Sequence, residues 1–84
     1  MNYVHELINK AKKLDELLSV NYLEEKNLYK VDINMVFYRE IKTPFKTALY
    51  GLGGTIEVAC YDYIRKARGG LMIHVISDKT IEVV

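Results

Sequence analysis

Hydrophobic residues follow a helical period at the start of this chain. From Tyr3 onward they recur every three or four residues, and polar or charged residues fill the positions between them. The apolar face consists of Val4, Leu7, Ile8, Ala11, Leu14 and Leu18. Asn2 carries a side chain typical of an N-cap, so we predict a first helix that begins at Tyr3. Residues 21–27 lack a clear period, and we expect a loop or a short irregular strand there.

The period changes to two between Leu28 and Ile41, which predicts a half-buried antiparallel strand. One face would carry Val31, Ile33, Met35 and Phe37, and the other Lys30, Asp32 and Asn34. Pro44 ends this pattern, because proline has no amide for a strand ladder. The apolar residues from Phe45 to Tyr50 then predict a second strand, which would form a hairpin with the first.

Three glycines, Gly51, Gly53 and Gly54, precede a second helical pattern. Glycine permits positive φ and close backbone approach, so amides at this junction can hold a phosphate or simply make a turn. The helical face consists of Ile56, Ala59, Cys60, Tyr63, Ile64 and Ala67. The alternation of Ile56, Val58 and Cys60 also fits a strand. A strand would leave unexplained the end signals, which are Thr55, Glu57, Arg65, Lys66, Arg68, Gly69 and Gly70, so we predict a helix.

The last segment reads as two short strands. Leu71 to Ile76 is apolar on both faces, residues 77–79 form a turn, and Thr80 to Val84 returns. No linker, repeat or low-complexity tract divides the chain. We therefore predict one small α+β domain over residues 1–84, in the order α-β-β-α-β-β, with an antiparallel sheet, two helices on one face and an extra strand near Tyr22.

Charge and cysteine content narrow the functional classes. Lys and Arg number 12 and Asp and Glu 11, a net charge of +1, so a nucleic-acid site would have to be a local patch. The single cysteine, Cys60, excludes an intrachain disulfide and a cysteine-rich zinc site, and we expect a buried thiol in a reducing cytosol. No segment reads as a signal or membrane helix, so we expect a soluble cytoplasmic protein.

The glycine junction resembles that of the double-stranded-RNA-binding domain, G-x-G-x-Ser-x-x-x-Ala, which is matched here by Gly51, Gly53, Thr55 and Ala59. The chain more closely resembles, over residues 28–84, the N-terminal domain of the small-subunit ribosomal protein of the S-five family, a divergent version of that fold. The matching residues there are Gly51, Gly53, Glu57, Val58, Ile64, Lys66, Ala67, Leu71, Val75, Thr80 and Ile81. The resemblance implies an RNA-binding α+β module.

The chain departs from both families where they contact RNA. In the duplex-binding family, lysines follow the capping residue and hold phosphates together with the helix N-terminus. Here Ile56 and Glu57 stand at those positions, and Gly54 stands where the ribosomal family has a lysine. A carboxylate there would repel a phosphate and would itself satisfy the helix dipole, which removes the strongest family contact.

Basic residues on both sides of the junction can still form a nucleic-acid patch. The candidate residues for binding are Lys42, Lys46, Gly53, Gly54, Thr55, Arg65, Lys66 and Arg68. The alternative is that Asp62 pairs with Lys66 at i, i+4, while Arg65 and Arg68 only cap the helix.

Seven tyrosines and no tryptophan point to a contact surface. Tyr63 lies on the predicted core face, whereas Tyr38, Tyr50 and Tyr61 lie opposite their neighbours' apolar sets. An exposed tyrosine suits protein contact or base stacking. We expect Tyr38 and Tyr50 to be adjacent on the hairpin and assign all three exposed tyrosines to a protein interface, unless a helix covers them.

Catalytic and cofactor signatures are missing from the sequence. His5 and His74 lie far apart, and neither has a carboxylate or cysteine at ligand spacing. His74 reads as a strand residue that faces opposite Leu71, Ile73 and Val75. No Ser/His/Asp set or Walker-type lysine appears, so we expect no enzyme, no metal and no cofactor.

Two functions remain open. The first is a small RNA-binding or ribonucleoprotein-associated module. The second is a non-catalytic protein-interaction module, such as a phage-type inhibitor or a homo-oligomer, that uses the tyrosines or the edge strand from Thr80 to Val84.

Overall fold

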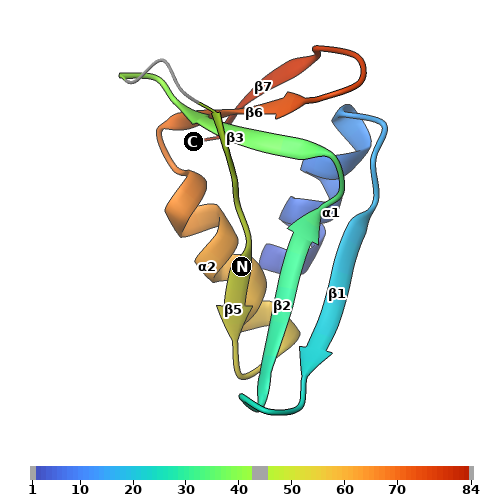
Figure 1. The fold of residues 1–84 in the computed structure, drawn as a ribbon, viewed down its shortest axis with the longest axis vertical. Coiled ribbons are helices and arrows are strands. Elements are labelled where there is room, and N and C mark those ends of the chain that lie inside the picture. Colours follow the sequence, from blue (N-terminus) through green and yellow to red (C-terminus); the bar gives the residue numbers. More distant parts are fainter. Residues whose placement is uncertain (1, 43–45, 84) are drawn as a thin grey trace.

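A computed structural model describes residues 2–42 and 46–83 of the chain and shows an α+β domain (Figure 1). The prediction of two helices combined with antiparallel strands is confirmed, although the described residues form more strands than expected. In chain order the elements are α1 (Tyr3–Lys13), β1 (Leu18–Leu23), β2 (Leu28–Ile33), β3 (Val36–Glu40), β4 (Lys46–Ala48), β5 (Gly51–Gly53), α2 (Ile56–Ala67), β6 (Gly70–His74) and β7 (Thr80–Val83).

The strands divide between two antiparallel sheets. The first has the order β1-β2-β5, and both helices pack behind it (Figure 1). The second has the order β4-β3-β6-β7 and crosses the end of the domain where α2 terminates. The predicted hairpin exists in this sheet as the pairing of β3 with β4, although Phe45 lies outside the described residues.

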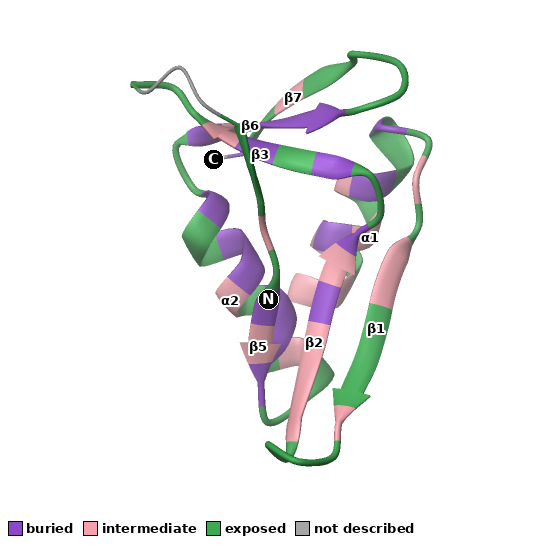
Figure 2. Cartoon of the chain, viewed as in Figure 1, coloured by how far each residue is buried: buried purple, intermediate pink, exposed green. Residues whose placement is uncertain are grey.

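One apolar core joins the helices to both sheets (Figure 2). Its largest fully buried side chains are those of Tyr63, Leu7, Leu14, Ile64, Met72, Val31 and Cys60. The predicted core positions of α2 are all buried except Ile56, because their spacing places them on the face that meets the first sheet. Burial raises the pKa of the Tyr63 hydroxyl, and nearby Asp32 raises it further.

The single long strand predicted from Leu28 to Ile41 is wrong, because a turn at Asn34 and Met35 divides it into β2 and β3. Met35 adopts a positive φ of 57°, and the chain leaves the first sheet to enter the second. The turn also reverses which side chains are buried: Val36 and Tyr38 enter the core, while Met35 and Phe37 are exposed.

The first helix also ends earlier than the hydrophobic spacing predicts. It stops at Lys13, with Leu14 as its C-cap and Asp15 at a positive φ of 57°, and Leu18 belongs to β1. Asn2 is the N-cap as predicted, since its side chain accepts a hydrogen bond from the His5 amide at 3.0 Å. The strand expected near Tyr22 is confirmed as part of β1.

Candidate nucleic-acid interface

The start of α2 is held by contacts within the molecule. Thr55 is the N-cap, as predicted, and its hydroxyl accepts a hydrogen bond from the Val58 amide at 3.1 Å. A Cβ on Gly51 would lie 2.1 Å from the Ala59 carbonyl oxygen, and one on Gly53 would lie 2.4 Å from the Ala59 amide nitrogen. Both glycines are therefore required so that β5 can lie against the backbone of α2. A positive φ is not the reason for glycine at these two positions. Among the described glycines, the one with a positive φ is Gly69, at 83°.

Glu57 turns away from the glycine junction and caps the other helix. Its carboxylate accepts hydrogen bonds from the amides of Tyr3 and Val4, at 2.6 and 3.4 Å. These amides belong to the first turn of α1, where a negative charge is favoured by the helix dipole. Tyr61 lies one turn further along α2 and packs edge-on against the Tyr3 ring, with 4.8 Å between the ring centres. The first half of α2 thus anchors α1.

A cluster of charges lies in the second half of α2. Asp62 pairs with Lys66 and Arg65, each at 2.8 Å, and accepts a hydrogen bond from the Leu52 amide at 3.0 Å. The predicted i, i+4 pair is confirmed. Burial alone would raise the pKa of Asp62, but the hydrogen bonds from Lys66, Leu52 and Arg65 outweigh it and lower this pKa to about 2.

Lys66 extends beyond this cluster to the exposed ring of Tyr50. Its ammonium donates a hydrogen bond to the Tyr50 carbonyl oxygen at 3.3 Å and lies 5.2 Å from the ring centre. The Lys30 ammonium, from β2, lies 5.0 Å from the same ring centre. Both distances are within the range of cation–π attraction. Tyr50 is 46% exposed, and both ammonium groups lie over its ring.

Each residue of this pair lines a different surface hollow. The larger, which we call the basic groove, has a volume of about 350 Å³ and is lined by Tyr38, Glu40, Ile41, Lys42, Lys66, Arg68 and Gly69. The smaller, the tyrosine hollow, has a volume of about 220 Å³ and is lined by Leu23, Lys26, Lys30, Tyr50 and Leu52. Lys66 lines the first and contacts Tyr50, which lines the second, so the two form a connected surface.

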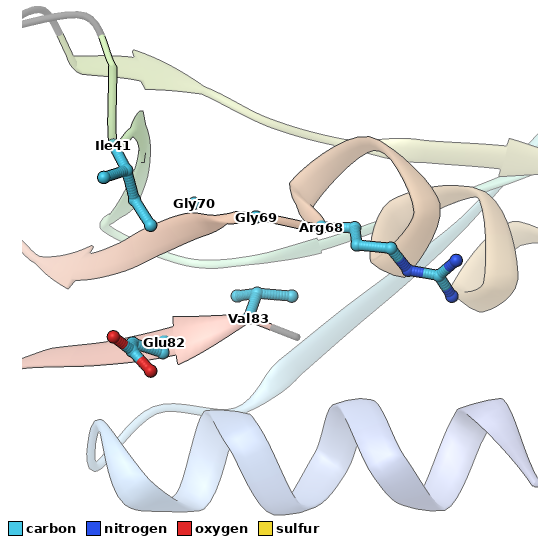
Figure 3. A pocket seen from close by; sticks show the side chains of 6 residues that line it. All are labelled: Ile41, Arg68, Gly69, Gly70, Glu82 and Val83. Atoms are coloured by element: carbon cyan, nitrogen blue, oxygen red, sulfur yellow. The ribbon is translucent and has the colours of Figure 1, made fainter.

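A third pocket continues the basic groove toward the second sheet (Figure 3). Its volume is about 490 Å³, and its lining shares Ile41, Arg68 and Gly69 with the basic groove and adds Gly70, Glu82 and Val83. The Arg68 guanidinium extends away from Ile41 and Val83 in this view. The pocket is therefore mainly apolar, with charge at its margins.

Six of the eight candidate residues from the sequence fall into two groups at opposite ends of α2. Lys42, Lys66 and Arg68 come together in the basic groove, whereas Gly53, Gly54 and Thr55 lie at the helix start. Lys46 and Arg65 do not line either hollow. Lys46 is exposed on β4, and Arg65 pairs with Asp62. Sequence reasoning missed Lys26 and Lys30, because nothing in the pattern indicated that β5 pairs with β2 and places Lys30 opposite Leu52.

The expectation that Tyr38 is exposed is wrong. Tyr38 is 6% exposed, because the turn at Met35 shifts the alternation of β3 by one residue. Burial, with the nearby charge of Glu40, raises the pKa of its hydroxyl. Tyr38 pairs with Thr47 in β4, so it is not the ribbon neighbour of Tyr50 that the sequence predicts. Tyr50 and Tyr61 are exposed as expected.

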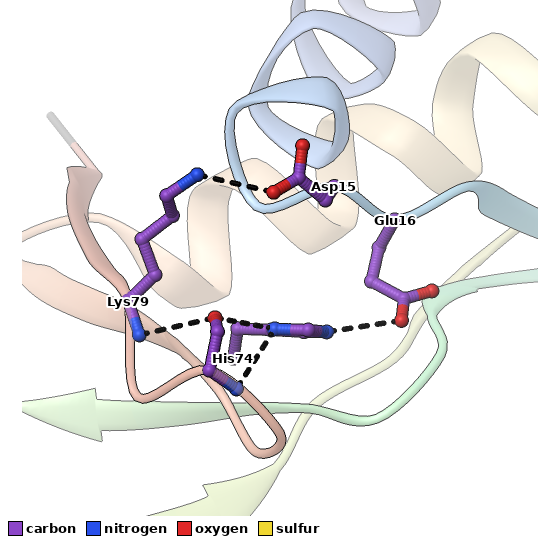
Figure 4. Close-up of polar contacts among 5 residues, drawn as sticks. Asp15, Glu16, His74 and Lys79 are labelled. Carbon is purple, nitrogen blue, oxygen red and sulfur yellow. Dashed lines mark hydrogen bonds and ion pairs between the residues drawn. The ribbon is translucent and has the colours of Figure 1, made fainter.

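A polar cluster that the sequence did not indicate ties the end of α1 to the turn between β6 and β7 (Figure 4). His74, 5% exposed, contacts Glu16 through Nε2 at 3.0 Å and the Ser77 hydroxyl through Nδ1 at 2.7 Å. Lys79 pairs with Asp15 at 3.1 Å. The residues that line the three pockets above do not include any of this cluster. Its evident role is to join distant segments.

The single thiol lies in the core, and the described residues form no cluster suited to a metal ion. Cys60 is buried as expected, and burial, with the charge of Glu57, raises its pKa to about 11. Among residues 2–42 and 46–83, no three His, Cys, Asp or Glu side chains are grouped so as to hold a metal ion. None of the described helices has the length and apolar character needed to cross a membrane.

Comparison of the chain with protein-family models, curated proteins and solved structures finds no match. The resemblance to duplex-RNA-binding and ribosomal domains therefore stays a prediction.

Proposed function

We propose that this protein is a small, non-catalytic RNA-binding or ribonucleoprotein-associated module. Its RNA site is the surface made by the basic groove and the tyrosine hollow. The observation that carries this proposal is the contact of Lys66 with Tyr50, which joins two hollows lined by cations around an exposed aromatic ring. In proteins that bind single-stranded nucleic acid, cations follow the phosphate backbone and aromatic faces stack the bases.

The charges of this surface favour a polyanion despite the near-neutral chain. Lys26, Lys30, Lys42, Lys66 and Arg68 line the two hollows, with Glu40 as the carboxylate among the lining residues. Asp62 lies beside them, but it is already paired with Lys66 and Arg65. Glu24 and Glu25 lie beside Lys26 in an adjoining hollow, so phosphates meet mainly positive charge along Lys30, Lys42, Lys66 and Arg68. The single buried thiol suits a reducing compartment, and we place the module in the cytoplasm.

This site lies at the opposite end of α2 from the one that the family resemblance implies. At the helix start, Thr55 and the packing of Gly51 and Gly53 against Ala59 serve the fold. Glu57, which occupies the place of a family lysine, points to the amides of α1. The proposal therefore keeps the RNA ligand of the resemblance and assigns it to the last turn of α2.

Binding of labelled RNA tests the proposal. We expect affinity that falls steeply between about 50 mM and about 200 mM salt, and a roughly tenfold loss at the lower salt when Lys42→Gln and Arg68→Gln are combined. The matched control combines Lys12→Gln and Lys13→Gln, which removes the same charge from an exposed stretch of α1. Equal losses in the two double variants, or no binding at low salt, would overturn the proposal.

Self-association is a second candidate function, favoured by the place of β7 at the edge of the second sheet. An edge strand presents unpaired amides and carbonyls that can add a strand from another chain. Analytical ultracentrifugation over a wide concentration range distinguishes this candidate. A protein that stays monomeric throughout removes it, and a dimer disrupted by Glu82→Pro in β7 supports it.

A further inference from the structure

We infer that the site takes a single-stranded RNA segment, with one unpaired base stacked on Tyr50. This inference rests on the proposed function and specifies which form of RNA is bound. Tyr50 lies between β4 and β5, lines the tyrosine hollow and contacts Lys66 of the basic groove.

The backbone around Tyr50 is held in place before any ligand arrives. Lys66 donates to its carbonyl oxygen at 3.3 Å, and the next residue, Gly51, is buried against α2. A ring carried by such a constrained segment loses little conformational freedom on binding, which favours its use as a contact surface. Among the residues that line the tyrosine hollow, Tyr50 supplies the aromatic ring.

The charges beside the ring fit the backbone that continues from a stacked base. The ammonium groups of Lys30 and Lys66 lie 5.0 and 5.2 Å from the ring centre and come from different elements, β2 and α2. A base that stacks on the ring displaces an ammonium group from above it, and that cation can then pair with a flanking phosphate of the base. Lys42 and Arg68 then extend the positive surface along the basic groove.

A duplex cannot use this arrangement in the same way. In a double helix the bases are stacked on one another, so the flat faces of the bases are hidden. A protein then meets the base edges in the grooves, the sugars and the phosphates. An aromatic ring gains stacking energy only from a base that is unpaired and turned outward. The sequence-tolerant nature of stacking also means that no particular base is required.

The test compares a labelled oligouridylate single strand, the same length of DNA and a blunt RNA duplex. We expect the single-stranded RNA to bind more tightly than the duplex, and Tyr50→Leu to weaken its binding about tenfold. Because this change removes no charge, the dependence of affinity on salt should keep its slope. Tyr50→Phe should retain most of the affinity. Tyr61→Leu, at an exposed tyrosine outside the two hollows, is the matched control; it removes the ring contact with Tyr3 but should leave the RNA affinity unchanged.

The outcomes separate this inference from the proposed function. Salt-dependent RNA binding that Tyr50→Leu leaves unchanged, or a preference for the duplex, would overturn the inference while the RNA-binding function stands. A change in the salt slope with Tyr50→Leu would assign the loss to the neighbouring lysines and would also overturn it. Equal affinity for the DNA strand would support stacking without recognition of the ribose. Absence of binding to all three probes would overturn both proposals.

Discussion

At its first turn, α2 keeps its polar groups within the molecule, because Thr55 caps the helix itself and Glu57 caps α1. At its last turn, Lys66 and Arg68 line a hollow that is open to solvent. The glycine-rich junction is the more conspicuous feature of the sequence, yet its glycines serve close packing. The accessible charge lies where side chains from a strand, a loop and a helix meet. A motif can therefore mark a tight contact in the fold while the binding surface forms elsewhere.

The largest expected effect comes from filling the contact between β5 and α2. In Gly51→Ala, the new methyl would lie 2.1 Å from the Ala59 carbonyl oxygen, so backbone must move on one side or the other. We expect a loss of about 3 kcal/mol in the free energy of unfolding, measured by urea denaturation. Gly54→Ala is the matched control, since a Cβ there meets nothing within 4 Å. Its unfolding free energy should change by less than about 1 kcal/mol, and similar losses in both variants would contradict the packing role of Gly51.

The next effect concerns the cap that α2 supplies to α1. Glu57→Ala leaves the amides of Tyr3 and Val4 without their carboxylate acceptor, and we expect a loss of about 1–2 kcal/mol in urea denaturation. Glu57→Gln should lose less, because the amide oxygen still accepts a hydrogen bond. Glu25→Ala, on the exposed turn after β1, controls for loss of a negative charge. A result for Glu57→Ala no larger than for that control would refute the cap.

A pH titration examines the other end of the helix. The pKa of Asp62 is lowered to about 2 in the folded protein and would be about 3.9 in the unfolded chain. Its charge therefore stabilises the fold above about pH 4, and this contribution is lost as the pH falls toward about 2. Allowing for solvent screening, we expect wild type to lose about 1 kcal/mol over this range relative to Asp62→Asn, measured by urea denaturation. Parallel pH profiles for the two proteins would show that Asp62 contributes nothing.

The smallest effect is expected for Arg65, one of the two cations that pair with Asp62. Arg65 is exposed and lies outside the residues that line the hollows, so Arg65→Gln should change the unfolding free energy by about 0.5 kcal/mol or less. At constant salt, the RNA affinity should stay within about twofold of wild type, a change that the loss of one positive charge near the site would itself explain. A tenfold loss of RNA affinity in this variant would move the interface to the outer face of α2.

Sequence reasoning succeeded for α2 because the signals that define it are local. Thr55 bonds Val58 three residues away, and Asp62 pairs with Lys66 within one turn. It failed at Met35, which has no preference for a turn and continues the alternation of its neighbours, so the change of sheet left no mark in the pattern. The candidate site was predicted in part for the same reason. The cations at the end of α2 were visible, but Lys30 and Tyr50 join them through the pairing of β2 with β5.

The contacts of α1 determine when it can dock while the protein folds during translation. Tyr3 bonds Glu57, Glu16 bonds His74, and Asp15 pairs with Lys79. These partners follow by 54, 58 and 64 positions in the chain. The first helix therefore emerges long before the groups that complete its two ends have been translated. Until then its apolar stripe has no finished partner surface, so stable docking waits until the chain as far as Lys79 has left the exit tunnel.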